Sequence, residues 1–166
     1  MSNRNSVSKT AWSGKTAIVV GASTGLGRTL AEALAAQGAA HIILVARDAD
    51  RLAATARQFT EKWPAVRFSF HATDVSAVPG VASLEQYLAA LFSKAASPVE
   101  SRADLLINAV GLSDRGPALK LTSQRLDELM HTNVHAPLLV VQILARHMAT
   151  GGVVVNIGSV SSYFAP

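Results

Sequence analysis

The sequence predicts an α/β fold in which a doubly wound parallel sheet has helices on both faces. Five short apolar runs recur along the chain, and most are continuous, as expected for strands buried on both sides. Between them lie longer segments rich in Ala and Leu, spaced to give the apolar stripe of an amphipathic helix. This alternation favours right-handed crossovers and the strand order 3-2-1-4-5.

Each element is expected at a definite place. The expected strands are, in chain order, Thr16–Val20, Ile42–Ala46, Val66–His71, Leu105–Asn108 and Val153–Ile157. The expected helices are Leu26–Gln37, Ala49–Lys62, Val81–Ala95 and Ser123–Met148. Gly38 follows the first helix as a stop signal, Asp48 can cap the second, and Pro64 lies just past its end.

Length and composition limit the possible classes of protein. The chain has 166 residues, which suits one domain, and we expect a polar tail over residues 1–13 and the folded domain over 14–166. It contains no cysteine, which excludes disulfides and thiolate chemistry. No apolar run approaches the roughly 20 residues of a membrane span, and the N-terminus lacks the apolar core of a secretory signal. We therefore expect a cytoplasmic protein without a membrane span.

The net charge of +4 is a mild basic excess. Because no basic stripe interleaves with aromatic residues, we expect no nucleic-acid partner, although a basic RNA-binding domain remains a weaker alternative. His131 and His135 are four residues apart on one expected helix, but no third ligand is evident, so we predict no metal site.

A glycine-rich turn joins the first strand to the first helix. Residues 20–27 read V-G-A-S-T-G-L-G. Gly21 would permit the tight turn, Gly25 would allow a ligand to approach the backbone, and Gly27 would let the helix pack closely on the strand. The helix N-terminus could then bind a pyrophosphate through its free N–H groups. A purely structural turn is the alternative, but the context favours a dinucleotide-binding, Rossmann-like domain.

The residue after the second strand indicates which nicotinamide cofactor is used. An Asp or Glu about 20 residues beyond the glycine turn usually holds the free ribose of NAD. Here that region carries Ala46 and then Arg47, whose guanidinium suits the 2′-phosphate of NADP(H). Asp48 is better explained as a helix cap, and Arg28 could add positive charge. The alternative for Arg47 is a solvated arginine at a strand end.

Asn133 precedes Pro137 by four residues in an expected helix. Proline has no N–H, so the carbonyl of Asn133 should lose its helical partner and need another donor, for which water is suited. An ordinary proline kink is the alternative.

Several motifs together resemble the short-chain dehydrogenase/reductase family. The G-x-x-x-G-x-G spacing is similar to that family's, and Asp74 follows the third strand where the family has an aspartate. Residues 108–111 look like a variant of its N-N-A-G segment, with Ala109 and Val110 as departures. Asn133 and the segment 156–159 match its helical asparagine and its serine. The resemblance runs from about Lys15 to Pro166.

The resemblance implies roles for these residues. Asp74 would accept a hydrogen bond from adenine, Asn133 would hold a relay water by its main chain, and Ser159 would donate a hydrogen bond to the substrate carbonyl. A helix cap or turn for Asp74, and a plain strand exit for Asn108 and Gly111, are the structural alternatives. The expected catalytic residues are Ser159 and Asn133. The expected cofactor-binding residues are Gly21, Ser23, Thr24, Gly25, Leu26, Gly27, Arg47, Asp74, Asn108 and Gly111.

The family's proton donor is a tyrosine in Y-x-x-x-K, roughly thirteen residues beyond the serine. Here that position would be near 172, past the end of the chain, and neither Tyr87 nor Tyr163 has a lysine four residues on. We therefore expect the N-terminal, cofactor-binding part of an NADP(H)-dependent oxidoreductase that transfers hydride to a carbonyl or from an alcohol, homo-oligomeric at full length. The alternative is a non-catalytic NADP-binding or interaction module.

Overall fold

The computed structural model describes residues 12–95 and 101–159, and it confirms the predicted fold class. A five-stranded sheet has the order β3-β2-β1-β4-β5, and all four strand pairs are parallel. The strands are β1 (Thr16–Val20), β2 (His41–Ala46), β3 (Arg67–Ala72), β4 (Ala103–Asn108) and β5 (Met148–Asn156). This is the 3-2-1-4-5 order expected from the sequence.

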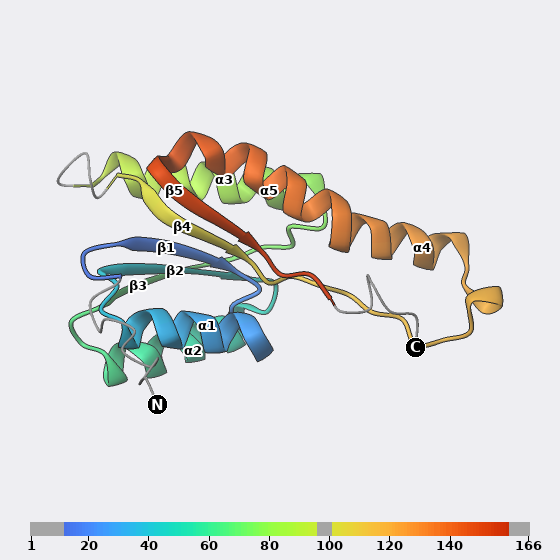
Figure 1. Ribbon diagram of the computed structural model, residues 1–166, viewed down its shortest axis with the longest axis horizontal. Helices are drawn as coiled ribbons and strands as arrows, with labels where there is room; N and C mark the ends of the chain where they lie inside the picture. Colours follow the sequence, from blue (N-terminus) through green and yellow to red (C-terminus); the bar gives the residue numbers. More distant parts are fainter. Residues whose placement is uncertain (1–11, 96–100, 160–166) are drawn as a thin grey trace, which may run out of the picture.

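Helices cover both faces of the sheet. The α-helices are α1 (Gly25–Ala36), α2 (Ala49–Lys62), α3 (Val78–Ser93), α4 (Ser123–Met130) and α5 (Ala136–Leu144). Three short helical segments are η1 (Ala118–Lys120), η2 (His131–His135) and η3 (Ala145–His147). Helices α1 and α2 lie on one face, α3 and α5 lie on the other, and α4 projects beyond the carboxyl ends of the strands (Figure 1).

Strand β1 shows why the sequence favours this layered arrangement. Its five residues are all buried. Ala17 and Val19 belong to the apolar cluster under α1 and α2, whereas Ile18 and Val20 belong to the cluster under α3 and α5. Since side chains alternate along a strand, a continuous apolar run supplies both cores at once.

The expected helix over Ser123–Met148 is wrong in two respects. Its middle, η2, is a π-helix in which the Ala136 N–H donates to the carbonyl of His131, five residues back. Pro137 lies immediately beyond and has no N–H to donate, so the wider turn occurs where the ordinary helical ladder is interrupted. The helix also ends at Leu144 rather than Met148.

Strand β5 begins earlier than predicted, at Met148 rather than Val153. The pairing with β4 shifts between Ala103 and Leu105, which face Met148 and Val153 respectively. Gly151, at φ +80°, lies within this irregular stretch. Helix α3 also begins earlier, at Val78 rather than Val81, because Pro79 is tolerated in the first turn of a helix.

Candidate cofactor site and active site

The glycine turn after β1 is closely packed. Gly21 has φ +88°, and the N–H groups of Gly21 and Ala22 donate to the carbonyl of Val45, at 2.8 and 3.1 Å. A Cβ atom on Gly21 would lie 2.7 Å from the carbonyl oxygen of Ala109. A Cβ atom on Gly27 would lie 2.3 Å from the carbonyl oxygen of Gly21. These two glycines therefore allow α1 and the β4 exit to approach the turn.

Gly25 has a different role, because its surroundings are open. It has φ +53°, and a Cβ atom there would meet nothing within 4 Å. Thr24 is the N-cap of α1, yet its side chain makes no capping hydrogen bond. The first amide groups of α1 are thus not used by this cap, which suits an anionic ligand at the helix start. The turn therefore fits the pyrophosphate of a dinucleotide.

This turn opens into a cleft of about 430 Å³ at the carboxyl ends of the strands. Topology explains the location, since ligands of doubly wound sheets bind outside these strand ends. The predicted cofactor residues that line it are Gly21, Ser23, Thr24, Gly25, Leu26, Arg47, Asp74 and Gly111. Gly27 is buried beneath the turn instead, and Asn108 lines a neighbouring cleft.

Arg47 lines the first cleft, and its side chain is 75% exposed. Its Nη1 is 3.9 Å from Oδ2 of Asp74. The other carboxylate oxygen of Asp74 accepts hydrogen bonds from the backbone N–H and the hydroxyl of Ser76, at 3.0 and 2.7 Å. Asp74 therefore fixes the turn after β3 while it remains on the cleft wall.

Arg28 lies elsewhere and does not supplement Arg47. Its guanidinium donates to Oε1 of Gln58 at 2.6 Å and lies over the Phe59 ring, 5.2 Å from the centroid. Arg51, which the sequence did not single out, lines the cleft instead. Its sequence position could have indicated this, because Arg51 follows the cap Asp48 by three residues and therefore lies on the same side of α2.

A second cleft, of about 810 Å³, adjoins the first and shares residues 109–111 with it. Both predicted catalytic residues, Asn133 and Ser159, line this second cleft. Its apolar wall includes Val134, Leu138 and Ile157. The structure thus brings the two together beside the cofactor cleft, although their catalytic roles remain predictions.

Asn108 makes a buried link between the sheet and α5. Its side chain is at the end of β4, and its Nδ2 donates to Oδ1 of Asn156 at 2.7 Å and to the carbonyl of Pro137 at 3.5 Å. Only 3% of Asn108 is exposed. These contacts join the ends of β4 and β5 under the second cleft; cofactor binding by Asn108 remains a prediction.

Both polar atoms of the Asn133 side chain form hydrogen bonds with the loop after β4. Its Oδ1 accepts from the backbone N–H of Leu112, and its Nδ2 donates to the carbonyl of the same residue, both at 2.8 Å. The side chain thus anchors the loop at two points.

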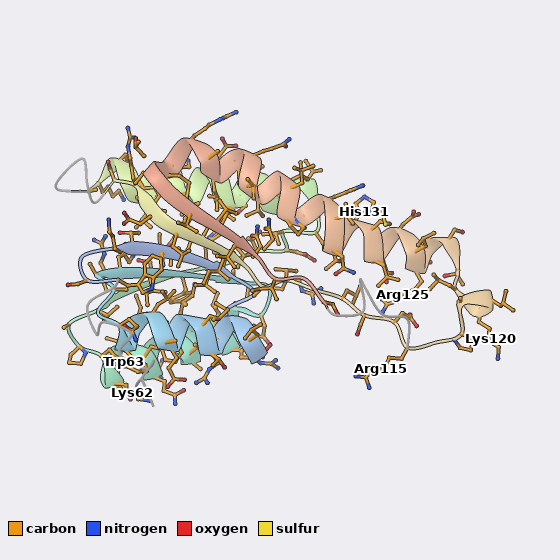
Figure 2. The ribbon with its side chains drawn as sticks, viewed as in Figure 1. Lys62, Trp63, Arg115, Lys120, Arg125 and His131 are labelled. Carbon is orange, nitrogen blue, oxygen red and sulfur yellow. The ribbon has the colours of Figure 1, made fainter. Side chains whose placement is uncertain are left out.

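Arg125 on α4 holds the next part of this loop. It contacts Asp114 and Glu128 at 2.8 and 2.7 Å and donates to the carbonyl of Ser113 at 3.2 Å. The hydrogen bond from Arg125, together with the backbone N–H of Gly116, lowers the pKa of Asp114 below its ordinary value. Figure 2 shows Arg125 between α4 and the extended segment that leads away from β4. The sequence does not signal this anchor, because its partners in the loop, Asp114 and Ser113, are eleven and twelve residues away.

Tyr87, the tyrosine that the structure describes, lines neither cleft. Tyr87 stacks on His71 with ring centroids 4.5 Å apart, on the α3 side of β3, and Tyr163 lies outside the described residues. His131 and His135 make an edge contact with centroids 4.8 Å apart, and no group of three possible metal ligands occurs within residues 12–95 and 101–159.

Comparison with known proteins identifies the family. The family model described as short chain dehydrogenase matches residues 15–165, nearly the whole chain. The chain belongs to the short-chain dehydrogenase family. This membership confirms the resemblance inferred from the glycine spacing and from the segments that follow the third, fourth and fifth strands.

Two curated relatives of this chain are named for a sugar acid and a polyol. Gluconate 5-dehydrogenase of Gluconobacter oxydans is 39% identical over 157 residues, covering 92% of this chain and 56% of that protein. D-threitol dehydrogenase of Mycolicibacterium smegmatis is 32% identical over 148 residues, covering 88% of this chain and 53% of that protein. The chain therefore spans about half the length of these short-chain dehydrogenases.

Solved short-chain dehydrogenases share the same architecture. L-sorbose reductase of Gluconobacter frateurii, complexed with NADPH and L-sorbose, has a TM-score of 0.81 and 29% identity, covering 93% of this chain and 56% of that one. A short-chain dehydrogenase of Burkholderia cenocepacia in complex with NADP has a TM-score of 0.79 and 26% identity over 93% of this chain and 59% of that one. Among the described residues, no helix has the length and apolarity needed to cross a membrane.

Proposed function

We propose that this chain forms the cofactor-binding part of an NADP(H)-dependent oxidoreductase that interconverts a carbonyl and an alcohol. One observation carries the proposal: the first cleft, which Arg47 lines, shares residues 109–111 with a second cleft that Asn133 and Ser159 line. A dinucleotide spanning the first cleft could present its reactive end to the second. When bound, the nicotinamide would supply or accept the hydride.

The chain's own residues would hold and polarise the reactants. The amides at the start of α1 would bind the pyrophosphate, and Arg47 would bind the 2′-phosphate. Ser159 would donate a hydrogen bond to the substrate oxygen as negative charge develops there. The main-chain carbonyl of Asn133 would hold a water for proton transfer. The names of the relatives favour a polyhydroxylated substrate such as a sugar, a polyol or a sugar acid.

Titration with NADPH and NADH, followed by fluorescence, tests the cofactor assignment. We expect NADPH to bind more tightly, and Arg47→Gln to weaken NADPH binding by about ten- to a hundredfold while leaving NADH little changed, because charge-assisted hydrogen bonds to the phosphate are lost. Arg57→Gln is the matched control, since Arg57 is exposed on α2, the helix that follows Arg47, and does not line the cleft. Equal affinity of the wild type for both cofactors would contradict the assignment.

A turnover assay separates the oxidoreductase from the alternative of a non-catalytic binding module. Gluconate, sorbitol and L-sorbose are suitable substrates, with a simple ketone for comparison. Oxidation or reduction of any of them by the protein, lost in Ser159→Ala, supports the enzyme. NADPH binding without turnover in the corresponding full-length protein favours the module. Cytoplasmic location, homo-oligomerisation and the absence of a nucleic-acid partner stay predictions.

A further inference from the structure

The charged groups of the cofactor cleft form two opposed pairs. The charged residues that line it are Arg47, Asp48, Arg51 and Asp74. Arg47 lies near Asp74, whereas Nε of Arg51 is 3.5 Å from Oδ2 of Asp48. The four formal charges therefore cancel. A 2′-phosphate brought to this cleft meets two carboxylates as well as two guanidinium groups.

Asp48 is the more serious obstacle to an anion. It is adjacent to Arg47 in the chain, and its side chain is 47% exposed. Its Oδ1 is used as the N-cap of α2, where it accepts the backbone N–H of Arg51 at 2.9 Å. Its charge nevertheless remains on the cleft wall. Without compensation, this carboxylate would repel a phosphate and could accept a hydrogen bond from a free ribose hydroxyl, as acidic residues in NAD sites do.

We propose that Arg51 is a second determinant of cofactor specificity, which acts by neutralising Asp48. This inference rests on the proposed NADP(H) function and assigns a role to a residue that is neither in the glycine turn nor at the strand end. The helix fixes the pairing, because Asp48 and Arg51 are three residues apart and face the same side. The positive charge of Arg51 thus offsets the negative charge of Asp48, so that the N-cap of α2 does not repel a phosphate.

The test uses a cycle of four proteins: wild type, Arg51→Gln, Asp48→Asn and the double variant. Asparagine caps helices about as well as aspartate, so Asp48→Asn removes the charge and retains the cap. The dissociation constants of NADPH and NADH are measured by fluorescence titration at low and high salt. Thermal unfolding reports whether each variant folds. Arg57→Gln is the matched control, with the same change of charge further along α2.

We expect Arg51→Gln to weaken NADPH binding about tenfold and to leave NADH binding unchanged or slightly tighter. In the Asp48→Asn background, the same substitution should change NADPH binding less than about threefold. The loss of NADPH affinity caused by Arg51→Gln should become smaller as the salt concentration increases, because Arg51 and Asp48 are exposed to solvent. Arg57→Gln should change neither constant.

Three outcomes would overturn the inference, and they are distinguishable. Equal losses of NADPH affinity in both backgrounds would mean that Arg51 acts independently of Asp48. If Arg47→Gln weakens NADPH binding while Arg51→Gln behaves like Arg57→Gln, the proposed function stands and the role of Arg51 fails. If the wild-type protein shows no preference for NADPH, both the proposed function and this inference fail.

Discussion

Individual side chains in this protein often serve the backbone rather than a ligand. Asn133 is the clearest case, because both ends of its amide bind the backbone of Leu112. The sequence could place Asn133 in a helix near Pro137, but it could not reveal an anchor to a residue 21 positions away. The same holds for Asn108, which meets Asn156 across the sheet. The sequence could predict that these asparagines lie near the carboxyl ends of the strands. Their hydrogen-bond partners could be identified only from the structure.

Replacing Asn133 by Ala should loosen the loop after β4. Two neutral hydrogen bonds at a solvent-accessible site are lost, so we expect the free energy of unfolding to fall by about 1 kcal/mol, or a few degrees in Tm. Gln124→Ala is the control for stability, because Gln124 is an exposed residue of α4. Calorimetry that shows equal Tm values for both variants would contradict the anchoring role.

His41 should make stability depend on pH. Its Nδ1 lies 2.8 Å from Nη2 of Arg67, which can only donate, so Nδ1 must accept and the proton is on Nε2, 2.8 Å from the Ser69 hydroxyl. Burial, reinforced by the charge of Arg67, lowers the pKa of His41 from 6.5 to about 4. The folded state therefore holds His41 neutral over a range in which the unfolded chain binds a proton.

The expected consequence is a loss of stability on acidification. The contribution is fully present above pH 6.5 and is lost as the pH falls toward 4, by an amount on the order of 3 kcal/mol. Urea unfolding at several pH values should show a smaller loss for His41→Gln than for the wild type. His135→Gln, at an exposed position, should retain the wild-type slope; parallel curves for His41→Gln would refute this account.

At the scale of elements, the sequence predicted the bounds of a helix where residues at its two ends mark them. It failed where the apolar spacing of a helix continues into the following strand. Helix α2 matches its predicted bounds because Asp48 and Pro64 mark its two ends. By contrast, the expected helix over residues 123–148 continued too far, since Met148 extends the apolar spacing of α5 although it begins β5. The glycines at 151 and 152 concealed the start of that strand, because they carry no apolar side chain.

The π-helical turn before Pro137 should hold Asn133 in register with Leu112. Pro137→Ala supplies a new N–H, and we expect the segment to relax toward an ordinary helix and to displace the Asn133 amide. Amide hydrogen exchange should then become faster at Leu112, whose N–H is bound to Asn133. The amide of Leu106, in the centre of β4, serves as the internal reference. Unchanged protection at Leu112 would show that the register does not depend on proline.

Helix α3 is positioned against the turn after β3 by Gly80. A Cβ atom there would lie 1.9 Å from the carbonyl oxygen of Asp74, which is backbone and cannot move aside easily. We expect Gly80→Ala to reduce the free energy of unfolding by about 1–3 kcal/mol and to weaken NADPH binding through displacement of Asp74. Gly158→Ala is the control for stability, because its Cβ meets nothing within 4 Å.

At the scale of the whole molecule, topology made the location of the site predictable. Parallel strands in the order 3-2-1-4-5 bring the ends of β1, β2, β3 and β4 to one edge, and the cofactor cleft is found there. The balance of charge in that cleft was not predictable, because it depends on which guanidinium faces which carboxylate. The projecting α4 and its Arg125 anchor were also unforeseen, since no local pattern signals them (Figure 1).

Strand β5 is an outer strand of the described sheet, and its features favour association with other chains. It pairs with β4 alone among the described strands, it contains no charged residue, and Val153, Val154 and Val155 are 37–48% exposed. Natural proteins usually protect such margins with charge, proline or covering structure. We expect the 166-residue polypeptide to self-associate as its concentration rises, in sedimentation velocity experiments. Val154→Lys should reduce this association, whereas Val78→Lys, at an exposed site on α3, should not.

Within the described residues, β5 pairs with a strand on one side, so the N–H and C=O groups of its other side can pair with an extended chain that presents complementary groups. We therefore expect the yield of soluble recombinant polypeptide to depend on whether these groups are paired during folding. A lysine within β5, or a segment that pairs with this strand, should increase that yield. We therefore expect substitutions in one strand, Met148–Asn156, to control the aggregation of this 166-residue polypeptide.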